Sequence, residues 1–302
     1  MNESFFAKIE ESPYVYHYTS MEALFSILEG YRLVKYTGLL PFRASCIYNV
    51  NDPREMELGF DAVEKSLSQY ENNNQNNMNL SEVYKDSSFK EYYIDSYNEK
   101  PNDGMIQFGI VPYIISFSCI RDFLPMWSMY GNKCKGVCLK FNIISIMDKP
   151  VECTQYDLVS YDGDMDYNII EEHLSLLYDL DVKRKRTMTI DEKKEMVFNY
   201  CLCISPFIKS KDWSYEKEFR IVYNQNYALN IDYDHLKDYT LHGIEKKSIQ
   251  KYVYIPINAC AIEEIIIGSL ADFNVMEHII RQELKECLMN RVKISRSSIA
   301  IT

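Results

Sequence analysis

Alternating and periodic apolar positions divide the chain into short strands and helices. Residues 14–18 alternate as a strand does, and Thr19 and Glu22 have the spacing of a capping box that begins a helix. Gly30 stands where a left-handed residue would end that helix. The pattern therefore predicts a strand, a short helix, and a second strand near residues 32–35.

A second helix is predicted from the sequence NDPRE. Asp52 is expected as the N-cap, Pro53 as the first helical residue, and Glu55 as the side chain that reaches back to the cap. The apolar face continues to Tyr70 and then gives way to an Asn-rich stretch with nothing to bury. Residues 71–79 are therefore expected to form a mobile loop.

The remaining pattern mixes strands and helices without a regular βαβ repeat. Strands are predicted at residues 113–118, 137–141, 219–223, 252–257, 265–267 and near 292. Helices are predicted from Pro125 and over residues 168–180, 190–203 and 273–288. The order favours an α+β fold with a largely antiparallel sheet or two packed sheets, built as one elaborated domain over residues 1–302.

Composition narrows the range of partners. The formal charge is -11, which disfavours nucleic acid because phosphate binding depends on Lys and Arg. Nine irregularly spread cysteines indicate reduced thiols and a cytoplasmic protein, and no apolar stretch is long enough to span a membrane. The 25 tyrosines and 14 phenylalanines predict that aromatic rings dominate the core and any cleft.

Common catalytic and metal-binding motifs are missing from the sequence. It contains no Gly-rich phosphate loop, no HExxH helix and no GxSxG elbow. The pairs Cys134/Cys138 and Cys201/Cys203 lack the paired short spacing of a structural zinc site and have no histidine nearby. No metal is therefore expected, and these cysteines are predicted to be buried thiols.

Three short motifs carry candidate chemistry. His17 lies near the end of a predicted strand, between aromatic and hydroxyl side chains, where it can face a ligand. Ser116 and Ser118 share one face of a later strand, while Phe117 points into the core. Each of these features, taken alone, is also explained by packing or by a solvated sheet face.

The third motif is the acidic pair Glu216 and Glu218 at the entrance to a strand. If the backbone is extended, residues two apart point to the same side, and two close carboxylates raise the pKa of one another. The alternative is a solvated acidic edge, neutralised by Lys211, Lys217 or Arg220.

Together, the three motifs resemble the signature of ADP-ribosyltransferases, which is Arg or His, then Ser-Thr-Ser, then Gln/Glu-x-Glu. Phe117 departs from that pattern at the central position, and His17 stands where many such toxins have Arg. The chain also resembles an uncharacterised bacterial domain family with the ordered motifs HYTS, NDPRE, SFS, LPMW and EKEFR, all of which occur here.

The resemblance implies two packed sheets with NAD as co-substrate in the cleft between them. His17 would bind a ribose hydroxyl, Ser116 and Ser118 would shape the nicotinamide-ribose pocket, and Glu218 would be the catalytic acid. A fixed carboxylate there would stabilise the positive charge that develops on the sugar. Glu216 would orient or deprotonate the acceptor.

Further cofactor-binding candidates come from the same motifs. Tyr18, Trp127 and Tyr130 are candidates for stacking on nicotinamide, and Thr19 lies beside them in the first motif. Arg54 is a candidate to bind a diphosphate as a bidentate donor, although helix capping explains Asp52 and Glu55 without a ligand and is the favoured interpretation.

The leading hypothesis is an NAD-dependent ADP-ribosyltransferase or NAD-cleaving enzyme, which the resemblance associates with bacterial toxins and phage-defence effectors. One alternative is a non-catalytic nucleotide-sensing or protein-interaction module. A second is a nucleic-acid-processing effector that uses His17 and the two glutamates, with or without a metal. The sequence leaves the acceptor undefined.

Overall fold

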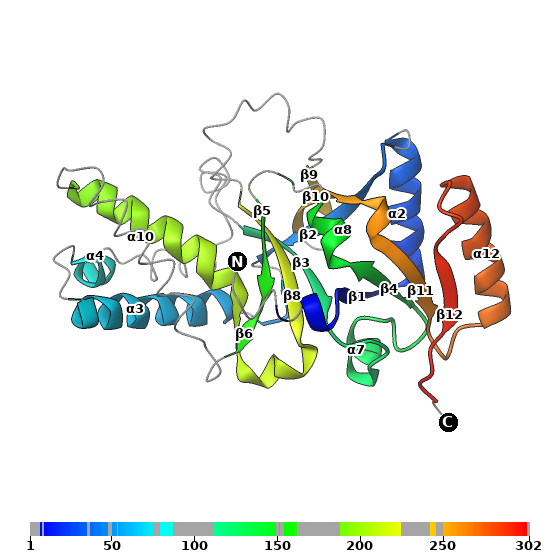
Figure 1. The fold of residues 1–302 in the computed structure, drawn as a ribbon, viewed down its shortest axis with the longest axis horizontal. Coiled ribbons are helices and arrows are strands. Elements are labelled where there is room, and N and C mark those ends of the chain that lie inside the picture. Colours follow the sequence, from blue (N-terminus) through cyan, green and yellow to red (C-terminus); the bar gives the residue numbers. More distant parts are fainter. Residues whose placement is uncertain are drawn as a thin grey trace.

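A computed structural model describes most of the chain, and Figure 1 shows its fold. The described residues are 7, 9–34, 37–47, 50–52, 54–74, 79–86, 112–148, 151, 154–161, 188–224, 242–245 and 250–300.

The helices are α2 (Met21–Leu33), α3 (Glu55–Asn74), α4 (Leu80–Asp86), α7 (Leu124–Met129), α8 (Ile143–Met147), α10 (Ile190–Ile204) and α12 (Phe273–Glu286). Short 3₁₀ helices are η2 (Ser205–Phe207), η3 (Lys211–Glu216) and η5 (Ala259–Ala261). The strands are β1 (Tyr14–Thr19), β2 (Leu39–Cys46), β3 (Pro112–Ser118), β4 (Val137–Asn142), β5 (Thr154–Leu158), β6 (Ser160–Tyr161), β7 (Ile208–Lys209), β8 (Glu218–Asn224), β9 (His242–Glu245), β10 (Gln250–Asn258), β11 (Ile262–Ile267) and β12 (Lys293–Arg296).

Ten of these strands form one sheet. Its main path runs β12-β11-β4-β1-β3-β2-β10-β9, with β8 beside β3 and β5 beside β8. All of its pairings are antiparallel except β11 with β12, and the short ribbon of β6 and β7 is also parallel. The predicted α+β class with a mostly antiparallel sheet is confirmed, although the ten strands are hydrogen-bonded into one branched sheet.

The sheet branches at β3. One edge of β3 pairs with β8 along its whole length, so β1 and β2 must share the other edge. On that edge β2 pairs with Tyr113 and Ile114, and β1 pairs with Ser118. Residues 115–117 therefore face a fork, where β1 and β2 diverge from β3.

Helices cover the sheet in two groups. Figure 1 shows α3, α4 and α10 at one end of the molecule and α2 and α12 at the other. The main core includes Phe117 and Phe219 on one face of β3 and β8, together with residues of α2 and α12. A second core joins Ile114 and Val222, on the opposite face of these strands, to α3, α4 and α10.

The first predicted helix begins and ends differently in the structure. Ser20, rather than Thr19, is the N-cap, because its hydroxyl accepts from the Ala23 amide at 3.2 Å. The helix continues through Gly30 to Leu33, so the predicted end at Gly30 and the predicted strand near residues 32–35 are wrong. A Cβ at Gly30 would lie 2.6 Å from Pro41 Cγ, which indicates that the glycine permits close packing against β2.

The second predicted helix also differs at both ends. Asp52 accepts from the Arg54 amide at 2.9 Å, but the helix begins at Glu55, whose side chain points to Lys209 and Arg220 instead of the cap. The helix ends at Asn74 and so includes the first four residues of the predicted mobile loop. Residues 75–78 of that loop lie outside the described part of the chain. The helix predicted over residues 168–180 also lies outside it.

The other predicted elements that fall on described residues are confirmed, with boundaries moved by a few residues. These are the strands β1, β3, β4, β8, β10, β11 and β12 and the helices α7, α10 and α12. The four cysteines at 134, 138, 201 and 203 are buried free thiols, as predicted.

Gly59 provides a test of the packing between α3 and η2. A Cβ there would lie 2.3 Å from Ser205 Cβ and 2.4 Å from Ser205 Cα, so Gly59→Ala forces the backbone apart. Overpacking costs about 1–3 kcal/mol, which we expect to exceed the gain of about 1 kcal/mol in helix propensity. Urea unfolding should show a net loss of stability, whereas Gln69→Ala on the exposed face of α3 should show none.

Candidate active site

The three sequence motifs meet at one cavity beside the fork in the sheet. Its volume is about 220 Å³, and its lining includes His17 from β1, Ser118 from β3 and Glu218 from β8. Strand register brings them together, because Ser118 is paired with Tyr16 on one side and with Glu218 on the other. Residues separated by two hundred positions in sequence thus share one site.

His17 enters the site from the aromatic side of the sheet. Its ring packs edge-on against Phe42 and Phe117, with centroids 5.0 and 5.6 Å away. Nδ1 lies 3.0 Å from the Ser116 carbonyl oxygen, which can only accept, so Nδ1 carries a proton. Burial lowers the pKa of His17, so the ring is neutral at pH 7 and Nε2 is left as a hydrogen-bond acceptor.

The two serines differ in exposure. Ser118 is buried, donates to the Glu216 carbonyl at 2.7 Å, and accepts from the Ile120 amide at 3.0 Å. Ser116 is exposed, and hydrogen bonding from its side chain helps to lower the pKa of Glu218. The two serines share one face of β3, but only Ser116 is exposed, whereas Ser118 is buried.

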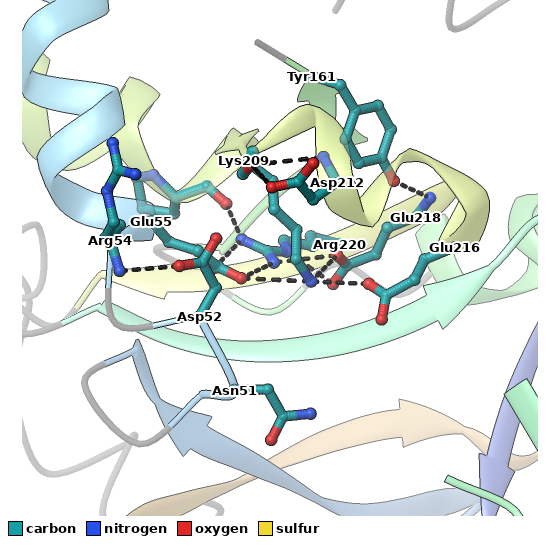
Figure 2. A network of polar contacts seen from close by, with 12 residues as sticks. Asn51, Asp52, Arg54, Glu55, Tyr161, Lys209, Asp212, Glu216, Glu218 and Arg220 are labelled. Atoms are coloured by element: carbon teal, nitrogen blue, oxygen red, sulfur yellow. Dashed lines mark hydrogen bonds and ion pairs between the residues drawn. The ribbon is translucent and has the colours of Figure 1, made fainter. Parts of the chain in front are cut away.

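Glu218 is a buried, ionised carboxylate. Figure 2 shows it among the charged side chains that converge here. Arg220 donates to both of its oxygens, at 2.7 and 3.0 Å, and Lys209 Nζ lies 3.2 Å from Oε2. Burial opposes ionisation, but the charges of Arg220 and Lys209 prevail and lower the pKa of Glu218 to about 2.

Glu216 lies beside it in a different environment. The backbone between the two is not extended as predicted, because Glu216 ends the η3 helix and Lys217 is left-handed with φ 44°. Both carboxylates nevertheless reach Lys209, which is 2.7 Å from Glu216 Oε2, while Tyr130 donates to Oε1 at 2.6 Å. Burial raises the pKa of Glu216 against the opposing effect of Lys209.

Glu55 completes a buried ion cluster with these side chains. It begins α3 and lies 2.8 Å from Arg220 and 3.3 Å from Lys209. Its carboxylate at the start of a helix is also favoured by the helix dipole. Two cations are thus shared by the three carboxylates of Glu55, Glu216 and Glu218, which leaves one excess negative charge when all five groups are ionised.

The sequence identified only part of this cluster. The acidic pair is not a solvated edge, since both side chains are at most 4% exposed. Of the three cations expected to neutralise the pair, Arg220 does bind Glu218, and its period-two spacing from Glu218 in a strand is a signal that could have indicated this contact. Lys209 lies in no motif, and no local pattern connects it with the glutamates.

The three candidate stacking residues lie differently. Tyr18 and Tyr130 line the cavity, but Trp127 does not, because its ring is fully buried and its Nε1 donates to Asp122 at 2.8 Å. Thr19 is also outside the lining. These placements remove Trp127 and Thr19 from the group that can contact a ligand in this cavity.

The NDPRE segment contributes residues that were not predicted. Arg54 is exposed and does not line the cavity, which argues against its contact with a diphosphate there. Asn51 and Glu55 do line it, and the Asn51 amide nitrogen donates to the Tyr130 hydroxyl at 3.1 Å. A chain of hydrogen bonds therefore runs from Asn51 through Tyr130 to Glu216.

Comparison with known proteins gives a partial match. Residues 126–221 match the family described as protein of unknown function (DUF2971). This segment includes EKEFR but not HYTS, NDPRE or SFS. Comparisons with curated proteins and with solved structures find no match. The match therefore indicates an uncharacterised domain and assigns it no activity.

Two further properties concern the described residues alone. No helix among them is both long enough and apolar enough to cross a membrane. Nor do they contain a group of three or more His, Cys, Asp or Glu side chains arranged to hold a metal ion.

The buried ion cluster predicts a specific dependence of stability on pH. Glu218 has a pKa of about 2 in the folded protein against 4.5 as its ordinary value, so its ionised form stabilises the fold above pH 4.5. This contribution, on the order of 3 kcal/mol, should disappear as pH falls from 4.5 towards 2. Urea unfolding at a series of pH values should show the loss.

Glu218→Gln should be less stable at pH 7 and should show a smaller loss between pH 4.5 and 2. Glu277→Gln, which changes an exposed ion pair on α12, should retain the wild-type pH profile. A profile of Glu218→Gln identical to that of the wild type would contradict the low pKa of Glu218.

Proposed function

We propose that this protein is an NAD-dependent ADP-ribosyltransferase or NAD-cleaving enzyme. The observation that carries the proposal is the shared cavity, in which His17, Ser118, Glu216 and Glu218 meet. The order of these residues in the sequence resembles that of ADP-ribosyltransferases. A role as a bacterial toxin or phage-defence effector rests on the resemblance alone.

The charge of the cavity suits cleavage of the nicotinamide–ribose bond. Both electrons of that bond leave with the nicotinamide ring, which becomes neutral, while positive charge develops on the ribose. Glu218 supplies a fixed anion. The positive charge of its partner Arg220 is shared with a second carboxylate, because Arg220 also binds Glu55. The excess negative charge of the cluster stabilises the oxocarbenium-like transition state.

His17 and Glu216 fit complementary tasks in this reaction. The unprotonated Nε2 of His17 can accept a hydrogen bond from a ribose hydroxyl, since Nδ1 is occupied by the Ser116 carbonyl. Glu216 has a raised pKa and a hydrogen bond from Tyr130, which suits a carboxylate that accepts a proton from water or from another acceptor. That acceptor then bonds to the ribose carbon.

The size of the cavity limits how much of NAD it encloses. At about 220 Å³ it is smaller than the roughly 300–1,000 Å³ typical of small-molecule pockets. We infer that it takes the nicotinamide-ribose end, with the adenosine half lying outside.

A second candidate function is a non-catalytic nucleotide-binding or protein-binding module. It is favoured by the saturation of Glu218, whose two oxygens are both bonded to buried cations and which is 4% exposed. In that case the cluster would only hold α3 against the sheet. Binding of NAD without release of nicotinamide would support this candidate.

Nicotinamide release from labelled NAD tests the catalytic role of Glu218. Glu218→Gln removes the anion from the transition state and should lower the rate by about 10²–10³-fold. The assay should include water and a panel of protein and nucleic-acid acceptors, because the acceptor is undefined. Glu277→Gln on the surface of α12 is the matched control and should retain the wild-type rate.

Because Glu218→Gln also disturbs a buried ion cluster, its fold must be checked by circular dichroism and thermal unfolding. His17→Ala leaves that cluster intact and should weaken the affinity for NAD. Release that is unaffected by either change would sink the assignment of this site.

Tyr130→Phe tests the acceptor side of the mechanism. Loss of the hydroxyl removes a hydrogen bond that lowers the pKa of Glu216, so this pKa should rise. Since Glu216 must be ionised to accept a proton, the acidic limb of the pH–rate profile should move to higher pH, and the rate on that limb should fall. The control is Tyr215→Phe, because the Tyr215 hydroxyl lies against Met129 Sδ. An unchanged acidic limb for Tyr130→Phe would exclude Glu216 as the proton acceptor.

A further inference from the structure

Asn51 presents an amide side chain to the cavity from the segment that leads into α3. The residue is exposed and lines the cavity, so it lies where the cavity meets solvent. Helix capping accounts for its neighbour Asp52, which accepts from the Arg54 amide, but not for Asn51. Figure 2 shows that the side chains of Asn51 and Asp52 point in different directions. The contacts of Asn51 within the cavity therefore decide what its amide can bind.

The hydrogen bonds of Tyr130 fix which end of the Asn51 amide faces it. The Tyr130 hydroxyl has one hydrogen, which it donates to Glu216 Oε1 at 2.6 Å. The hydroxyl oxygen can therefore only accept from Asn51, 3.1 Å away, so the atom that contacts it is Nδ2. Oδ1 is the other branch of the same amide, and no residue in the described part of the chain donates to it.

The position of this acceptor restricts the ligand group that can reach it. A single tyrosine hydroxyl joins Asn51 to Glu216. His17 and Glu218 line the same cavity, so a ligand whose ribose faces these two residues can bring its base to Asn51. An amide oxygen pairs with an N–H or O–H donor. On a nicotinamide ring bonded to ribose, the donor of this kind is the carboxamide NH₂ group.

We propose that Asn51 selects the nicotinamide ring by accepting a hydrogen bond from its carboxamide N–H at Oδ1. The inference rests on the proposed function, which supplies NAD as the ligand, and it adds the residue that recognises the substituent of the departing ring. Because the carboxamide is attached to one side of the ring, this contact also fixes the rotation of the ring about the bond to be cleaved. The carboxamide then lies beside Tyr130.

Affinity for two ligands that differ in one group tests the proposal. The 3-acetylpyridine analogue of NAD has a methyl group in place of the carboxamide NH₂ and keeps the carbonyl. Wild-type protein should bind NAD about threefold to tenfold more tightly than this analogue, which is the range for one neutral hydrogen bond. Intact ligand should be quantified after each calorimetric titration, so that turnover does not enter the measured Kd.

Asn51→Ala should remove the preference for NAD, because the acceptor of the carboxamide N–H is lost. Since the Asn51 side chain is exposed, this variant should fold as the wild type does. Tyr130→Phe should reduce the preference, because the amide of Asn51 is no longer oriented. The matched control is Asn274→Ala, at an exposed position of α12 outside the cavity lining, which should retain the full preference.

A role of Asn51 in supporting Tyr130 alone would give a different result. In that case Asn51→Ala should shift the acidic limb of the pH–rate profile and leave the ratio of the two Kd values as in the wild type. Such an unchanged ratio, or equal affinity of wild-type protein for the two ligands, would overturn the carboxamide site.

The failure of this inference is distinct from failure of the proposed function. If NAD is cleaved but NAD and the acetylpyridine analogue bind equally, the enzyme assignment stands and the role of Asn51 is wrong. If the preference for NAD depends on Asn51 but no nicotinamide is released, the cavity is a nicotinamide-binding site without that activity. If neither ligand binds and NAD is not cleaved, both proposals are wrong.

Discussion

Burial of Arg220 is the constraint on which much of this structure depends. Its side chain is 1% exposed, and a guanidinium removed from water without partners would cost several kcal/mol. Glu218 on its own strand, Glu55 at the start of α3 and the Pro206 carbonyl in η2 supply those partners. The same contacts attach the helical group of α3 and α10 to the central strands. The partners that Arg220 requires therefore also position the second core, which these helices form with β3 and β8.

The fork in the sheet places this cluster at a cavity. Because β8 occupies one whole edge of β3, the strands β1 and β2 divide the other edge between them. His17 occupies part of the opening, with an imidazole hydrogen bond to the Ser116 carbonyl. Side chains from both branches thus line the same cavity as the buried carboxylates.

The sequence predicted the fold class and most of the elements, because alternation and 3.6-residue periodicity are local signals. It failed where tertiary packing overrides a local signal, as at Gly30, which ends no helix but fits against Pro41. The motif residues His17, Ser118 and Glu218 were identifiable by type and order. Lys209 and Glu55 were not identifiable as their partners, because charges distant in sequence that meet only in the folded core leave no local pattern.

The ion cluster shifts the pKa values of its two glutamates in opposite directions. Arg220 holds Glu218 ionised and fixed, which suits a group that must be negative whenever positive charge develops nearby. Arg220 pairs with Glu218 and Glu55, whereas Glu216 pairs with Lys209 and accepts a hydrogen bond from the Tyr130 hydroxyl. Burial therefore acts on it with less opposition and raises its pKa. A difference of one cation between neighbouring carboxylates is thus sufficient to lower the pKa of Glu218 while the pKa of Glu216 is raised.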